Sequence, residues 1–122
     1  MAKLSAHGTE LYRFLSCTRG GLVSVRSDGT KLFRSPFGGW KLIARKKKEI
    51  SLEEWTRRKL AWRDEDRAKR PWAHEVKSLP SLRTLDRWAM DSVCETTDGQ
   101  TIEPDGVALN GSPSWLIALR MI

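Results

Sequence analysis

The stretch that decides the fold is ELYRFLSCTRGGLVSVRSDGTKLFRSPFGGWKLIAR, residues 10–45, in which short apolar runs are separated by glycine-containing turns. Residues 22–26 alternate between apolar and polar side chains, as a half-buried strand does. Asp28-Gly29 is a hairpin signal, because glycine tolerates the backbone angles of a tight turn. The pattern predicts an antiparallel meander of three or four strands, over residues 10–17, 22–26, 30–35 and 40–45.

Lysine and arginine occupy the polar positions of these strands, so we expect a basic sheet surface that continues into the run Arg45-Lys46-Lys47-Lys48. A shift of one residue moves every side chain of a strand to the other face, so the choice between Lys31 and Arg34 stays open. In the fourth strand we expect Lys41, Ile43 and Arg45 to share a side. The predicted binding residues are Arg13, Arg26, Lys31, Arg34, Lys41, Arg45, Lys46, Lys47 and Lys48.

Aromatic side chains lie among these charges, at Tyr12, Phe14, Phe33 and Trp40. One interpretation is a sheet surface on which nucleic-acid bases stack. The other is that they form the core, and we favour it because the sheet must pack against tryptophans that follow later in the chain.

Residues 51–122 are predicted to be mainly helical. Ser51-Leu52-Glu53-Glu54 is a capping box that begins a helix ending near Pro71. Leu82, Leu85, Ala89 and Val93 recur at helical spacing in a second helix, residues 81–95. Ser112-Pro113 supplies a cap and a first-turn proline before the apolar residues 115–122.

The predicted fold class is therefore α+β. An N-terminal antiparallel meander is covered on one face by two amphipathic helices and a short apolar C-terminal helix. We expect a single domain, residues 1–122, with a basic β-rich part at 1–48 and a helical part at 49–122.

The formal net charge of +7 is unevenly distributed along the chain. Residues 1–50 contain eleven Lys and Arg and three acidic residues, whereas residues 81–122 contain three and six. Such asymmetry favours a polyanionic partner, because fixed positive charge attracts and holds phosphates. A basic surface that serves only solubility is the alternative.

Sequence motifs of common enzymes are missing, since there is no Gly-x-Ser-x-Gly, P-loop, His-Glu-x-x-His or Cys-x-x-Cys. We expect a non-enzymatic protein without metal or cofactor. His74-Glu75 is interpreted as a surface dipeptide, and residues 64–66 as solvated helical charge. Cys17 and Cys94 are widely separated, which favours free thiols in a reducing compartment. No apolar run has the length of a signal peptide or a membrane span, so we expect a cytoplasmic protein that contacts no membrane.

The segment SLRTLDRW, residues 81–88, also looks like the second helix of a helix-turn-helix, with Arg83 and Arg87 on one side. It supports an alternative function as a direct DNA- or RNA-binding regulator. Pro71 and Pro80 interrupt the helix that would have to precede it.

Two further stretches, HGTELYRF at residues 7–14 and VRSDG at 25–29, resemble the start of small uncharacterised proteins carried by bacteriophages and mobile elements. Residues 39–41 (GWK) and the segments EPDG at 103–106 and SPSWL at 112–116 are similar to the same kind of protein. The resemblance implies short single-domain products that inhibit or redirect a host machine, including anti-CRISPR proteins that bind a Cas effector. It carries no site residue. The leading hypothesis is thus an inhibitor that binds a host protein or ribonucleoprotein complex, such as a CRISPR–Cas effector, in the bacterial cytoplasm.

Overall fold

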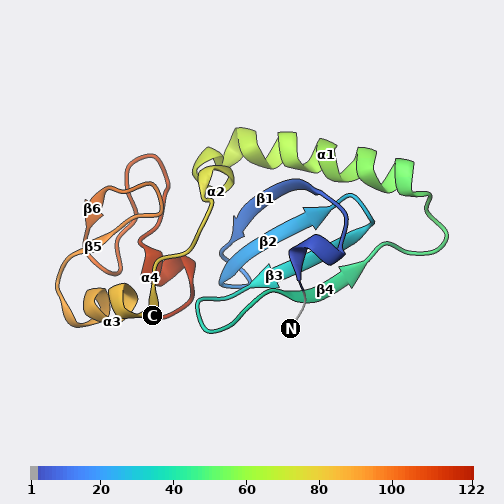
Figure 1. The fold of residues 1–122 in the computed structure, drawn as a ribbon. Helices are drawn as coiled ribbons and strands as arrows, with labels where there is room; N and C mark the ends of the chain where they lie inside the picture. Colours follow the sequence, from blue (N-terminus) through green and yellow to red (C-terminus); the bar gives the residue numbers. More distant parts are fainter. Residues whose placement is uncertain (1–2) are drawn as a thin grey trace.

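The computed structural model describes residues 3–122 and confirms the α+β class (Figure 1). Its main sheet is a four-stranded antiparallel meander in the order β1-β2-β3-β4. The strands are β1 (Glu10–Ser16), β2 (Gly21–Arg26), β3 (Thr30–Arg34) and β4 (Lys41–Arg45). The antiparallel meander predicted from the turn signals is therefore confirmed, and of the three or four expected strands the sheet has four.

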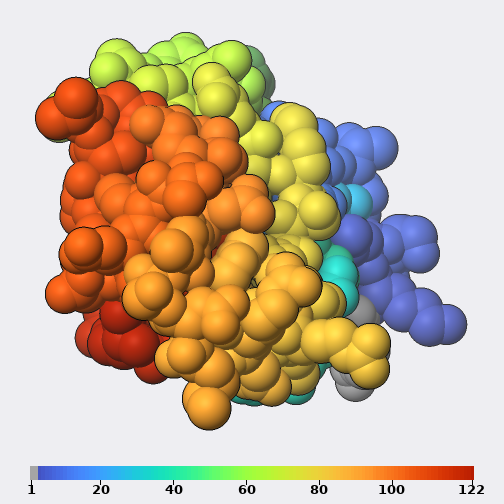
Figure 2. Space-filling view, turned by 90° about the vertical axis from the view of Figure 1, so that its left-hand side faces the viewer, coloured from blue at the N-terminus to red at the C-terminus, as the bar shows by residue number. Residues whose placement is uncertain are grey.

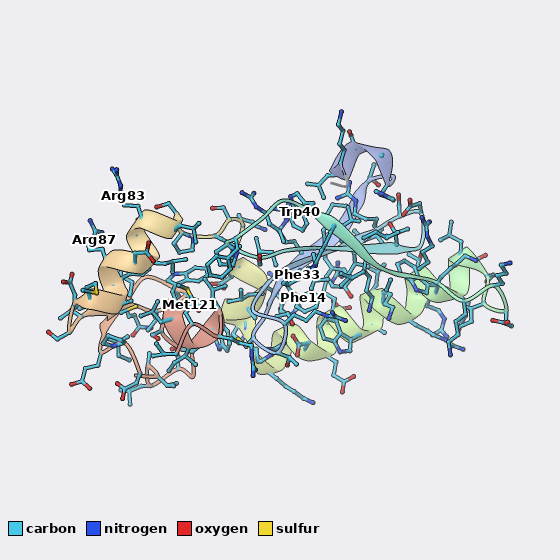
Figure 3. The ribbon with its side chains drawn as sticks, turned by 90° about the horizontal axis from the view of Figure 1, so that it is seen from below. Phe14, Phe33, Trp40, Arg83, Arg87 and Met121 are labelled. Carbon is cyan, nitrogen blue, oxygen red and sulfur yellow. The ribbon has the colours of Figure 1, made fainter. Side chains whose placement is uncertain are left out.

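Helix α1 (Leu52–Lys69) covers one face of this sheet, and the 3-10 segment η1 (Leu4–Ala6) lies over the other (Figure 3). Trp55 of α1 packs in one apolar cluster with Val23 and Phe33 of the sheet. The aromatic residues Tyr12 and Phe33 are buried, as expected of core side chains.

Helix α1 begins where the capping box predicted, because the Ser51 hydroxyl accepts a hydrogen bond from the Glu54 amide at 3.1 Å. The Glu54 carboxylate instead pairs with Arg57 and Arg58 on the next turn. The helix ends before Pro71, which opens the short helix α2 (Pro71–Glu75).

The rest of the chain forms α3 (Leu82–Met90), the hairpin β5 (Cys94–Glu95) and β6 (Thr101–Ile102), and α4 (Trp115–Ala118). The second helix is shorter than predicted, because the backbone becomes extended at Asp91 and leaves Val93 exposed. The cap of α4 is Ser114 and not Ser112, since the Ser114 hydroxyl accepts from the Ile117 amide.

Helix α3 packs on α4 beside the sheet instead of covering its face (Figure 1). Residues from α3 onward cover this end of the molecule (Figure 2). One cluster of buried side chains joins Leu15 and Leu22 of the sheet with Leu85 of α3 and Leu116 of α4. Buried side chains of one cluster therefore connect the sheet with the C-terminal part of the chain.

None of the helices within residues 3–122 combines the length and apolar composition needed to cross a bilayer.

Candidate anion-binding site

Arg26 is buried inside the protein, contrary to its predicted place on a contact surface. Only 5% of the residue is exposed. Its guanidinium donates hydrogen bonds to the carbonyl oxygens of Leu4, His7 and Gly8, at 3.1, 3.1 and 3.0 Å. It also lies 3.3 Å from the Glu10 carboxylate. Arg26 therefore holds the N-terminal segment on the sheet and is not available to a partner.

Arg13 is likewise occupied within the protein. One guanidinium nitrogen donates to the Lys77 carbonyl oxygen at 2.7 Å, and two others donate to Glu10. The guanidinium also stacks over the Trp40 ring, 5.0 Å from its centroid. The charge of Arg13 is thus neutralised by Glu10 and its side chain is held in place.

The remaining predicted cations do not share one face of the sheet. Lys31 pairs with Val25 across the strands and lies on the α1 face, whereas Arg34 pairs with Leu22 on the opposite face. Lys41 and Arg45 also lie on opposite faces, because a bulge in β4 places an extra residue, Ile43, in the strand. A prediction based on strict alternation could not include this bulge.

Five basic residues nevertheless line one pocket of about 300 Å³ between the β3–β4 strands and the start of α1. We call it the basic pocket. Its charged lining comes from Lys31, Arg45, Lys46, Lys47 and Lys59, and its remaining lining residues are Gly29, Ala44, Ile50 and Trp55.

Backbone contacts place the lysine run against the hairpin turn. The Lys46 amide donates to the Gly29 carbonyl oxygen at 2.7 Å, and the Lys46 ammonium donates to the Ile50 carbonyl oxygen at 3.1 Å. Gly29 has a φ of +88°, which favours glycine, and a Cβ there would lie 3.1 Å from the Lys46 side chain. The Asp28-Gly29 turn therefore positions the cationic run as well as the strands.

The basic pocket contains no carboxylate among its lining residues. Within the described part of the chain, none of its five cations forms an ion pair with Asp or Glu. Burial, together with the neighbouring ammonium of Lys59, lowers the pKa of Lys31 to about 8. The site is thus strongly positive, and its charge is not compensated by the protein.

This lowered pKa makes stability depend on pH in a defined direction. Between pH about 8 and the ordinary lysine pKa of about 10.4, the unfolded chain keeps a proton that folded Lys31 has released. The wild-type free energy of unfolding should therefore rise relative to that of Lys31→Met as the pH increases through this range. Urea unfolding of both proteins at pH 7.5 and 9.5 measures the difference. An equal pH response of the two proteins would contradict the assignment.

Lys59 is the pocket cation that was not predicted from the sequence. It follows Trp55 by four residues and precedes Trp62 by three, so it shares their side of α1. Its ammonium lies 5.9 Å from the Trp55 ring centroid. That spacing was a usable signal, although charged residues on a helix usually face solvent.

The alternative residues Arg83 and Arg87 are exposed and point outward from α3 (Figure 3). They lie at the end of the molecule opposite the connection between β4 and α1 (Figure 1). The helix before them, α2, has only five residues, so the pair lacks the full first helix of a helix-turn-helix.

His74 is buried, in contrast to its interpretation as a surface residue. Its Nε2 lies 2.7 Å from Asp66 Oδ2, and Arg70 donates to the same carboxylate. Asp66 is therefore part of an internal network that joins α1 to α2, and not only solvated helical charge. Among residues 3–122, no group of three or more His, Cys, Asp or Glu side chains is arranged to hold a metal ion.

No family model, curated protein or solved structure matches this chain.

Proposed function

We propose that this protein is a non-enzymatic binding protein whose basic pocket and the adjoining Arg45–Lys48 run engage an anionic partner. The observation that carries the proposal is the gathering of five cations around one pocket without a lining carboxylate. Paired surface charges serve solubility equally well, whereas unpaired cations in a concave site attract anions. The partner that we propose is a host nucleoprotein complex in the bacterial cytoplasm.

Two considerations support a nucleoprotein over an acidic protein. Phosphates are spaced regularly along a nucleic acid and bind clustered Lys and Arg by releasing counterions. The resemblance to bacteriophage and mobile-element proteins supports inhibition of such a complex, for which a CRISPR–Cas effector is the example. Binding of this protein to phosphates of the nucleic acid that the complex carries would block the complex without any chemical step.

Direct DNA or RNA binding through α3 is the second candidate. It is favoured by the exposure of Arg83 and Arg87, which are four residues apart on one helix and therefore neighbours on its surface. The positive charge of this α3 surface is smaller than that of the basic pocket, because only two cations contribute.

Two double variants, each with two cations changed to glutamate, distinguish the two candidate functions. Arg45→Glu with Lys47→Glu alters two exposed cations at the pocket, and Arg83→Glu with Arg87→Glu alters two exposed cations on α3. We expect the pocket variant to lose the nucleoprotein complex that wild type retains from a bacterial lysate, and the α3 variant to retain it. The retained complex is identified by mass spectrometry and by its nuclease-sensitive nucleic acid.

Anisotropy with labelled single-stranded and duplex DNA completes the test. If the partner is bare nucleic acid, the pocket variant should bind about tenfold or more weakly, with a salt slope smaller by about 2. If only the α3 variant loses binding, the binding site is at Arg83 and Arg87 instead of the basic pocket. Wild-type binding by the pocket variant in both assays would overturn the proposal.

A further inference from the structure

Two of the pocket cations, Lys31 and Lys59, face each other across the gap between β3 and α1. The cross-strand partners of Lys31 are Val25 and Ala44, so the lysine stands in an otherwise apolar row of the sheet. Lys59 lies between Trp55 and Trp62 along α1. An interface built from aromatic and apolar side chains thus contains a pair of like charges.

The two neighbouring ammonium groups of Lys31 and Lys59 repel each other when no anion is bound. Half-burial and the ammonium of Lys59 both disfavour the charged form of Lys31, and Arg19 adds to the repulsion. None of the carboxylates in the described ion pairs neutralises either lysine. An anion in the pocket that contacts both ammonium groups would offset the repulsion and supply the missing acceptors.

The space around the pair suits such an anion. The basic pocket, of about 300 Å³, and a second hollow of about 230 Å³ beside Phe14 and Trp62 share both lysines. Since one water occupies about 30 Å³ in the liquid, there is room for a phosphate and part of the molecule that carries it. Phosphate is favoured over a carboxylate because its several oxygens can accept hydrogen bonds from three or more cations at once.

We propose that the basic pocket is a phosphate site, in which one phosphate group contacts the ammonium groups of both Lys31 and Lys59. The phosphate belongs to the anionic partner, so this inference rests on the proposed function. Trp55 forms an apolar wall of the same pocket, suited to the sugar or base attached to that phosphate.

Inorganic phosphate is the first probe, compared with chloride at equal ionic strength by thermal unfolding. Saturating phosphate should raise the wild-type Tm by about 3 °C or more, because a ligand that binds only the folded state stabilises it. Lys59→Met should lose this shift and also raise the Tm without phosphate, since it removes the like charge. Lys69→Met, an exposed position on the same helix, should respond to phosphate as wild type does.

If Lys59 affected stability alone, Lys59→Met would change the Tm without phosphate but would keep the phosphate-induced rise in Tm. If Lys59→Met fails to fold, Lys31→Met is the second variant, with the same expectation. Absence of a phosphate shift in wild type, or an equal shift in the lysine variants, would overturn the phosphate site.

The source of the phosphate is identified by competition in the anisotropy assay. Short oligothymidylates that carry a 5′-phosphate or a 5′-hydroxyl are tested for their ability to displace the labelled single-stranded DNA. Stronger competition by the 5′-phosphorylated strand identifies a terminal phosphate, and equal competition identifies the backbone. Competition by neither strand would contradict a nucleic-acid source. The phosphate titration uses no nucleic acid, so its failure is separate from failure of the charge-reversal test of the proposed function.

Discussion

Arg26→Met is expected to lower the free energy of unfolding by about 3 kcal/mol, although sequence analysis placed Arg26 among surface binding residues. The side chain is buried and donates to three carbonyl oxygens of residues 4–8, to Ser24 and to Glu10. Removing one buried partner leaves several acceptors without a donor, and each hydrogen bond to a charged group contributes about 1.5–3 kcal/mol. Glu10 keeps Arg13 as a partner, which limits the loss.

Urea unfolding followed by far-ultraviolet circular dichroism measures this effect. Arg34→Met is the matched control, because Arg34 lies on the same sheet face but is exposed, and the change should stay within about 0.5 kcal/mol. Hydrogen exchange should also quicken at the Ser27 amide, which donates to Thr9 where the N-terminal segment meets the sheet. If the two variants are equally stable and only Arg26→Met loses partner binding, Arg26 contacts the partner and does not serve an internal structural role.

Leu116→Ala is expected to lower the free energy of unfolding by about 3 kcal/mol, the second large effect. Leu116 is fully buried in α4 and belongs to the cluster that contains Leu15 and Leu22 of the sheet. The substitution leaves a cavity where the sheet meets the C-terminal part of the chain. Both parts should therefore lose stability together.

Coincident transitions by tryptophan fluorescence and circular dichroism would show one cooperative unit, which is the predicted single domain. Leu109→Ala is the control, since Leu109 is fully exposed and its truncation removes no packing. Two separate transitions, with the sheet unaffected by the α4 substitution, would divide the chain into two units.

The features that could be predicted from sequence are those in which neighbouring residues interact. Asp28-Gly29 predicted a hairpin, because the Asp28 side chain accepts from the Thr30 amide and Gly29 takes the positive φ of the turn. Ser51 and Glu54 predicted the start of α1, since a helix cap joins residues three positions apart. The strand order followed, because short connections leave consecutive antiparallel strands adjacent.

The residues of the basic pocket were predicted only in part, because contacts between distant parts of the chain cannot be read from local sequence. Lys31, Arg45, Lys46 and Lys47 do line the basic pocket, but Lys59 joins them from a helix 28 residues after Lys31. Arg13 and Arg26 carry the same charge and are occupied internally by Glu10 and by backbone carbonyls. Charge is visible in a sequence, whereas the partner that neutralises it is not.

The sequence by itself determined the antiparallel meander, the turns within it, the capped helix α1 and the concentration of positive charge in the first half. Only the tertiary structure decided which cations are free, because a bulge in β4 reverses the alternation and long side chains find partners far away in the chain. Local pattern specifies secondary structure through contacts over a few residues. A site depends on which surfaces the folded chain brings together, and that is decided by packing of the whole molecule.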